Sequence, residues 1–176
     1  MHKRAAVRHP AAPAVWGDAA AHAVDTGTAG PFRCGMQDDV RRWRPEGRVW
    51  FWFETDKRQG DGWHLAADEA GCRDLEALVA LGKASPYPAR FSLSLGRVAG
   101  VKGEAVTRLL IACNADWLPD HWQIMRRGKE VIWELGMGQL EGLLGVAADL
   151  RRGELDHAIG GDAADQRVWL WWPPPS

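Results

Sequence analysis

The chain has 176 residues, 22 basic against 23 acidic side chains, and a formal net charge of −1. This length suits one domain with a substantial core, and the balanced charge argues against nucleic acid or an anionic membrane surface as a partner. No stretch approaches the roughly 18 apolar residues that a membrane-spanning helix needs. Three widely separated cysteines, Cys34, Cys72 and Cys113, do not form a disulfide framework. We therefore expect free thiols and a cytoplasmic location.

The first 35 residues differ in composition from the remainder of the chain. Residues 1–35 are rich in Ala, Gly, Pro and Thr and show no regular apolar spacing. Such a segment cannot bury enough surface to offset the entropy lost on ordering it, so we expect it to be flexible. Met36 opens the patterned part, and translation from Met36 would still give a complete domain. We expect residues 36–176 to form a single domain.

The first half of this domain shows two strand patterns, a helix and a third strand. Arg48–Glu54 (RVWFWFE) is aromatic and favours a β-strand, and a turn at residues 59–62 leads into a second strand, Trp63–Ala67. Asp68 is placed to cap a helix that ends near Gly82. Residues 89–95 alternate between apolar and polar side chains, as in a half-exposed strand. The helix is predicted from apolar residues at helical spacing, Cys72, Leu75, Leu78 and Val79.

The second half contains further strands and a second helix. Val106–Cys113 favours a strand, and His121–Met125 and Glu130–Leu135 form a hairpin around Gly128. Arg167–Trp172 (RVWLWW) is the last strand, stopped by three prolines. The second helix carries apolar residues at helical spacing and ends at a glycine suited to a C-cap; these are Leu140, Leu143, Leu144, Ala147, Leu150 and Gly153.

This order of elements predicts an α+β fold, with a mainly antiparallel, Trp-rich sheet of about five to seven strands and two helices packed on it. Two strand–helix–strand segments, Trp63–Leu95 and Glu130–Trp172, follow the same pattern. Their residue identity is low, so the sequence does not establish a duplication. Gly138, Gly142 and Gly145 on the second helix predict a close approach between that helix and the sheet.

Eleven tryptophans are the most unusual feature of the composition. Each indole buries about 200 Å² and offers one N–H donor, so a tryptophan serves either as a core block or as part of a binding surface. Two helices cannot cover both faces of five or more strands, which predicts an aromatic face that is uncovered or covered by a partner. The candidate binding residues are Trp50, Trp52, Trp122, Trp133, Trp169 and Trp171.

Few residues are candidates for catalysis. Asp116, Asp120 and His121 put carboxylates beside an imidazole, which could bind a metal or orient a general base. Only one histidine lies there, and Asp120 equally suits a turn at a proline. Glu130 and Glu134 share one face of a strand, where they could act as an acid–base pair or discourage edge pairing.

No nucleotide-binding, nucleophile-elbow or zinc-protease motif occurs in the sequence. Cys72 and Cys113 lie inside apolar patterns and are expected to be buried. We therefore assign no catalytic residue, no metal site and no cofactor.

These observations favour a non-enzymatic domain that binds another macromolecule, most simply a protein, and aromatic edge strands would also allow a homodimer. Trp63–Leu75 (WHLAADEAGCRDL) resembles the strand-to-helix step of several bacterial immunity-protein families. The resemblance implies a protein that blocks a toxin. Two alternatives remain, a small-ligand or carbohydrate-binding protein that uses exposed tryptophans, and a hydrolase-like or metal-dependent enzyme at Asp116, Asp120 and His121.

Overall fold

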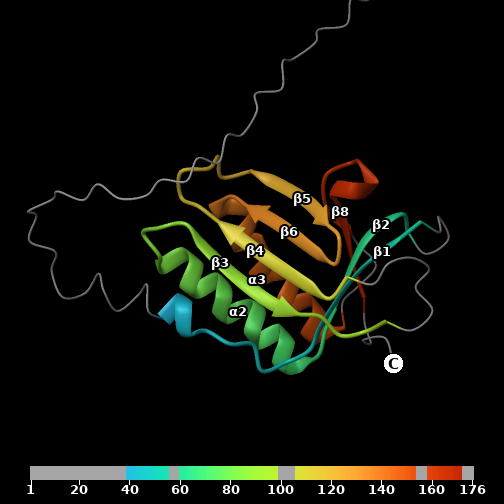
Figure 1. Ribbon diagram of the computed structural model, residues 1–176, viewed down its shortest axis with the longest axis horizontal. Helices are drawn as coiled ribbons and strands as arrows, with labels where there is room; N and C mark the ends of the chain where they lie inside the picture. Colours follow the sequence, from blue (N-terminus) through green and yellow to red (C-terminus); the bar gives the residue numbers. More distant parts are fainter. Residues whose placement is uncertain (1–38, 56–59, 99–105, 154–157, 172–176) are drawn as a thin grey trace, which may run out of the picture.

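The computed structural model describes residues 39–55, 60–98, 106–153 and 158–171. Within them the expected α+β class is confirmed (Figure 1). The segment 1–35, which we expect to be flexible, lies outside the described residues, as does Trp172. The elements in chain order are β1 (Val49–Glu54), β2 (Gly62–Ala67), α2 (Glu69–Ala84), β3 (Ala89–Ser94), β4 (Arg108–Cys113), β5 (Trp122–Arg127), β6 (Glu130–Leu135), α3 (Met137–Arg152), β7 (Ala158–Gly160), the 3₁₀ turn η1 (Ala164–Gln166) and β8 (Arg167–Leu170).

The described strands form two sheets of four, where the sequence indicated one sheet of five to seven. Sheet A has the order β1-β2-β8-β7 and sheet B the order β3-β4-β6-β5. Each sheet consists of two antiparallel hairpins, joined at its centre by a parallel pair, β2/β8 in sheet A and β4/β6 in sheet B. Most pairings are therefore antiparallel, as expected.

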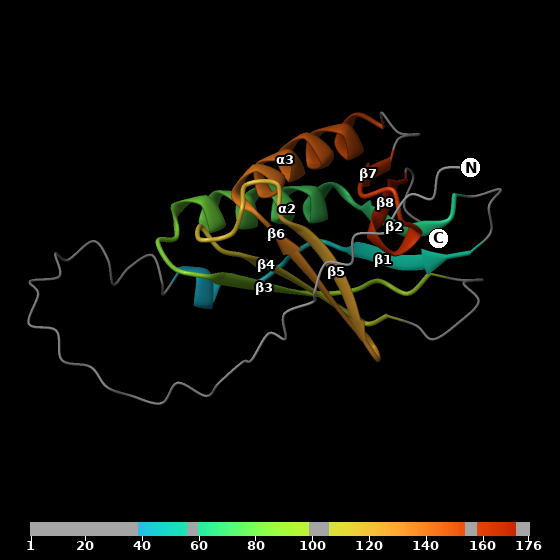
Figure 2. The ribbon, with the colours of Figure 1, turned by 90° about the horizontal axis from the view of Figure 1, so that it is seen from above.

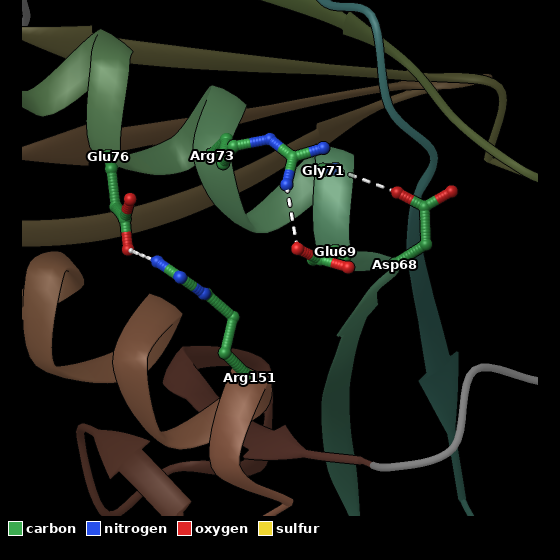
Figure 3. Close-up of polar contacts among 6 residues, drawn as sticks. All are labelled: Asp68, Glu69, Gly71, Arg73, Glu76 and Arg151. Atoms are coloured by element: carbon green, nitrogen blue, oxygen red, sulfur yellow. Dashed lines mark hydrogen bonds and ion pairs between the residues drawn. The ribbon is translucent and has the colours of Figure 1, made fainter.

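Helix α2 begins at the predicted cap. The Asp68 carboxylate accepts a hydrogen bond from the backbone N–H of Gly71 (2.7 Å; Figure 3), which satisfies one helix donor. It also accepts one from the backbone N–H of Arg48 (3.0 Å), which links the residue before β1 to the start of the helix. The helix continues past Gly82, where the sequence predicted its end, to Ala84, and Gly82 is a buried residue of the helix. An added Cβ at Gly82 would lie 2.9 Å from the Leu140 side chain, so this glycine lets α3 approach.

Helix α3 ends at Gly153, which has the left-handed conformation (φ 67°) predicted for a C-cap. The predicted close approach at Gly142 and Gly145 is wrong. Both glycines are exposed, and no atom lies within 4 Å of an added Cβ at either position. The buried side of α3 is formed by its larger apolar residues instead, Leu140, Leu143, Val146, Ala147 and Leu150.

The two helices lie side by side and run in opposite directions over sheet B (Figure 2). Each helix contributes one basic residue from its last turn to an ion pair with the other helix. Lys83 of α2 pairs with Glu141 (2.6 Å), and Arg151 of α3 pairs with Glu76 (2.8 Å; Figure 3). The hydrogen bond and charge of Lys83 lower the pKa of Glu141.

The two halves of the domain have the same architecture. Each is a hairpin, a helix and a hairpin, and a shift of 68 positions maps residues 62–84 onto residues 130–152 with identical boundaries for strand and helix. The same shift carries buried α2 positions onto the buried positions of α3. Only Leu75/Leu143 and Ala80/Ala148 are identical among these 23 pairs, which is why the sequence does not show the relation. The pairing pattern is that of an approximate two-fold axis, because exchanging the halves turns the β4/β6 pair into β8/β2.

Both sheets share one hydrophobic core, in which Phe51 of sheet A stacks on Trp133 of sheet B (ring centroids 5.8 Å apart). The sheet edges also meet. Val49 of β1 bridges to Leu95 after β3, and the Gln166 side chain bonds the backbone N–H and C=O of Ile124 (2.9 and 3.1 Å). These contacts close edges that would otherwise be open to pairing. No helix in the described ranges is long and apolar enough to cross a membrane.

Candidate functional site

Sheet A carries an aromatic surface on the side that faces away from the core. Side chains alternate along a strand, so Val49 and Phe51 enter the core cluster while Trp50 and Trp52 point the other way. The strand register places Trp52 opposite His64, and His64 beside Trp169. We call the surface formed by Trp50, Trp52, His64, Trp169 and Trp171 the aromatic face.

His64 is the centre of the aromatic face. Its imidazole is 1% exposed and lies between two indoles, that of Trp52 (centroids 5.1 Å apart, planes 24° apart) and that of Trp171 (5.5 Å, 26°). Nδ1 is hydrogen-bonded to the Trp171 indole N–H, and Nε2 lies 2.9 Å from the Gly60 carbonyl oxygen. An indole nitrogen only donates and a carbonyl only accepts, so both bonds require the neutral imidazole with its proton on Nε2.

Burial lowers the pKa of His64 below its ordinary value, because the charged form would lose its hydration. The hydrogen bond to the Gly60 carbonyl and the negative charge of Glu54 act in the opposite direction. His64 is therefore held neutral with both ring nitrogens engaged. This leaves it no free lone pair for general-base catalysis or metal binding.

Two glycines let backbone segments lie flat against the indoles of this face. Gly60 (φ +90°) approaches Trp169 so closely that an added Cβ would lie 2.7 Å from the ring, and the Trp169 N–H donates to the Asp61 carbonyl (3.1 Å). Gly96 covers Trp50 in the same way, with 2.4 Å between an added Cβ and the indole nitrogen. Trp169 of β8 is thereby held in place by the segment before β2, and Trp50 of β1 by the segment after β3.

Only some residues of the aromatic face are exposed to solvent. Trp171 is 37% exposed, Trp52 and Trp169 are half-buried, and Trp50 is buried. Trp52 stacks one ring face on His64, whereas Trp171 meets the imidazole edge to edge through its indole N–H. The arrangement can contribute apolar contact area and specific shape, but it contains no nucleophile.

The six tryptophans singled out from the sequence fall into two groups. Trp50, Trp52, Trp169 and Trp171 belong to the aromatic face. Trp133 is fully buried and packs edge-on against Trp122 (5.0 Å), whose indole N–H donates to the Gln166 carbonyl (2.8 Å). These two side chains belong to the packing between the sheets, and of the first group Trp52, Trp169 and Trp171 reach the surface.

His64 was not among the residues that the sequence singled out. Its role depends on the β1/β2/β8 register, which brings residues 52, 64 and 169 into one row across the sheet. Strand alternation places residue 64 on the opposite side from Trp63 and Leu65, which is the available local signal.

The candidate enzyme residues lie at the other sheet. His121 pairs with Glu134 (3.2 Å) and packs on the Trp117 ring (4.6 Å), while the Asp116 backbone N–H bonds Asn114 in a local turn (3.0 Å). Within the described ranges no three His, Cys, Asp or Glu residues are grouped so as to hold a metal ion. Burial raises the pKa of the Cys72 thiol to about 11, so this cysteine is a protonated core residue.

Comparison with protein-family models, with curated proteins and with solved structures finds no significant match to this chain.

Proposed function

We propose that this protein is a non-enzymatic domain that binds another protein through the aromatic face of sheet A. The observation that carries the proposal is the ordered row of Trp52, His64 and Trp169, with the 37% exposed Trp171 hydrogen-bonded to His64. Tryptophan is enriched in the energetic centres of protein interfaces, where a large and rigid apolar side chain loses little entropy on binding.

A protein partner suits this geometry better than a sugar or a nucleobase. Flat ligands stack on a free aromatic face, whereas one face of Trp52 lies against His64 and the rings of Trp50 and Trp169 lie against Gly96 and Gly60. A partner with a complementary apolar surface can contact ring edges and outer faces together. The carbohydrate-binding role remains the alternative that the binding test must separate.

The resemblance of Trp63–Leu75 to bacterial immunity proteins suggests the class of partner. This stretch forms β2 and the start of α2, and it contributes His64 to the aromatic face. The resemblance implies that the partner is a toxin, which this protein would block by covering the functional surface of the toxin.

Affinity capture from cells that encode the protein tests the proposal with matched variants. We expect Trp171→Ala to weaken retention of the partner, whereas Leu118→Ala, which removes a side chain that is 74% exposed elsewhere on the surface, leaves retention unchanged. Equal retention by both variants, or equal loss, would contradict a binding role for the aromatic face. A glycan that binds the wild type and not Trp171→Ala would support the carbohydrate-binding alternative instead.

A further inference from the structure

We propose that His64 is the positioning residue of the aromatic face, and that protonation of its imidazole releases Trp171 and makes partner binding sensitive to pH. The pH-sensitive arrangement concerns the chain alone, while its consequence for binding rests on the function proposed above.

The two hydrogen bonds of His64 are compatible with only one protonation state of the imidazole. The Trp171 indole N–H needs the lone pair of Nδ1, and the Gly60 carbonyl needs the proton of Nε2. Adding a proton to Nδ1 places two donors against each other. The bond to Trp171 is then lost, while the bond to Gly60 can remain.

Trp171 is the residue that can respond. Its backbone N–H donates to the Leu65 carbonyl (3.0 Å), which holds the main chain to β2, but its indole is already 37% exposed. The side chain can therefore rotate into water without disrupting a strand. Trp169 and Trp50 differ, because Gly60 and Gly96 cover their rings closely.

The charges around His64 modify this response without reversing it. Glu54 of β1 favours the imidazolium, and stacking on the Trp52 indole also favours a cation. From β8, Arg167 is a positive charge on the same side of the sheet, and Asp61 of the loop before β2 offers its backbone carbonyl to Trp169. Burial is the largest influence and favours the neutral ring.

The expected consequence is weaker partner binding in acid. An aromatic residue fixed in one position contributes to affinity without an entropy cost on binding, and a released residue must be ordered again. Binding should therefore weaken as pH falls below the ordinary histidine pKa of about 6.5.

Indole N–H resonances of the ¹⁵N-labelled full chain test the arrangement without a partner. The Trp171 signal is identified by its absence in Trp171→Phe. Between pH 7.5 and pH 4.5 we expect that signal to shift with one midpoint below 6.5, matching the midpoint of the His64 ring signals. His64→Gln, which keeps one donor and one acceptor but does not titrate, should abolish the shift, whereas the control His121→Gln should retain it.

Trp171→Phe provides a second readout that does not depend on the folding of a His64 variant. It removes the donor that requires a lone pair on Nδ1, so the His64 midpoint should rise toward 6.5. An unchanged midpoint in this variant, a wild-type Trp171 signal that does not shift, or a shift that persists in His64→Gln would overturn the proposal. Pronounced titration of Trp171 with no partner captured by the wild type would instead contradict only the proposed function.

Discussion

At the scale of single residues, the indole N–H groups distinguish tryptophans of similar burial. The Trp63 N–H donates to the Asp165 carbonyl (3.1 Å), whereas the Trp133 N–H meets no partner among the described residues although its ring is fully buried. A buried donor without a partner costs about 1–3 kcal/mol. The Trp133 site therefore accommodates an aromatic ring without forming a hydrogen bond to the indole nitrogen.

This difference predicts that substitution by phenylalanine will change the free energy of unfolding to different extents at the two sites. Trp133→Phe removes the unpaired donor, which offsets the loss of packed volume, so its free energy of unfolding should stay within about 1 kcal/mol of the wild type. Trp63→Phe removes the hydrogen bond to the Asp165 carbonyl, so its free energy of unfolding should fall by about 2 kcal/mol more than that of Trp133→Phe. Urea unfolding of both variants measures the difference. A larger loss for Trp133→Phe than for Trp63→Phe would show that the assignment of the two indoles is incorrect.

His64 also makes a prediction for stability. Its pKa is lowered by folding, so between that pKa and about 6.5 the unfolded chain binds more protons than the folded one. The stability contributed by the neutral ring is present above pH 6.5 and is lost as pH falls toward the folded-state pKa. Chemical denaturation at pH 7.5 and 5.0 should thus show a larger decrease for the wild type than for His64→Gln. Parallel decreases in the two proteins would argue against a lowered pKa.

At the scale of elements, local sequence rules predicted helix termini well and close contacts poorly. Asp68 and Gly153 act as the caps expected of them, because capping depends on a few neighbouring residues. The close approaches of α2 lie at Gly71 and Gly82, whereas Gly142 faces solvent. Glycine spacing alone does not reveal which side of a helix another element will cover.

Two glycine substitutions in helices should therefore have opposite effects. An added Cβ at Gly71 would lie 2.4 Å from the Arg48 carbonyl oxygen, a backbone atom that cannot move away easily, so Gly71→Ala should destabilise the fold by about 1–3 kcal/mol. Gly142→Ala meets no atom within 4 Å and should stabilise α3 by about 0.5–1 kcal/mol. Thermal unfolding of the two variants gives the signs. A stabilising Gly71→Ala would contradict the close contact between the entry to β1 and the start of α2.

The strands show a similar division between local and distant information. The alternation of residues 89–95 predicted the buried and exposed sides of β3 correctly, since that pattern is a property of one strand. Strand β7 was not predicted, because Ala158–Gly160 is too short to show alternation. Its pairing with β8 supplies the structure that its own residues do not indicate.

At the scale of the whole molecule, the division into two sheets could not be read from local patterns. The parallel pairs join β2 to β8 and β4 to β6, so each sheet takes one hairpin from each half of the chain. The sequence did show two segments of similar pattern, but it did not show that their hairpins are shared between sheets. The same long-range pairing assembles the aromatic face, since His64 and Trp169 meet only across β2 and β8.

The central claim is that this face, and in particular Trp171, contacts a protein partner. The most direct measurement is the Kd of the captured partner for the wild type, Trp171→Ala and Leu118→Ala at pH 7.5, with folding of each variant checked by thermal unfolding. For a tryptophan in the centre of an interface we predict a loss of about 2 kcal/mol, or roughly 30-fold in Kd, for Trp171→Ala. Leu118→Ala should bind like the wild type. A folded Trp171→Ala protein that binds with wild-type affinity would contradict the account.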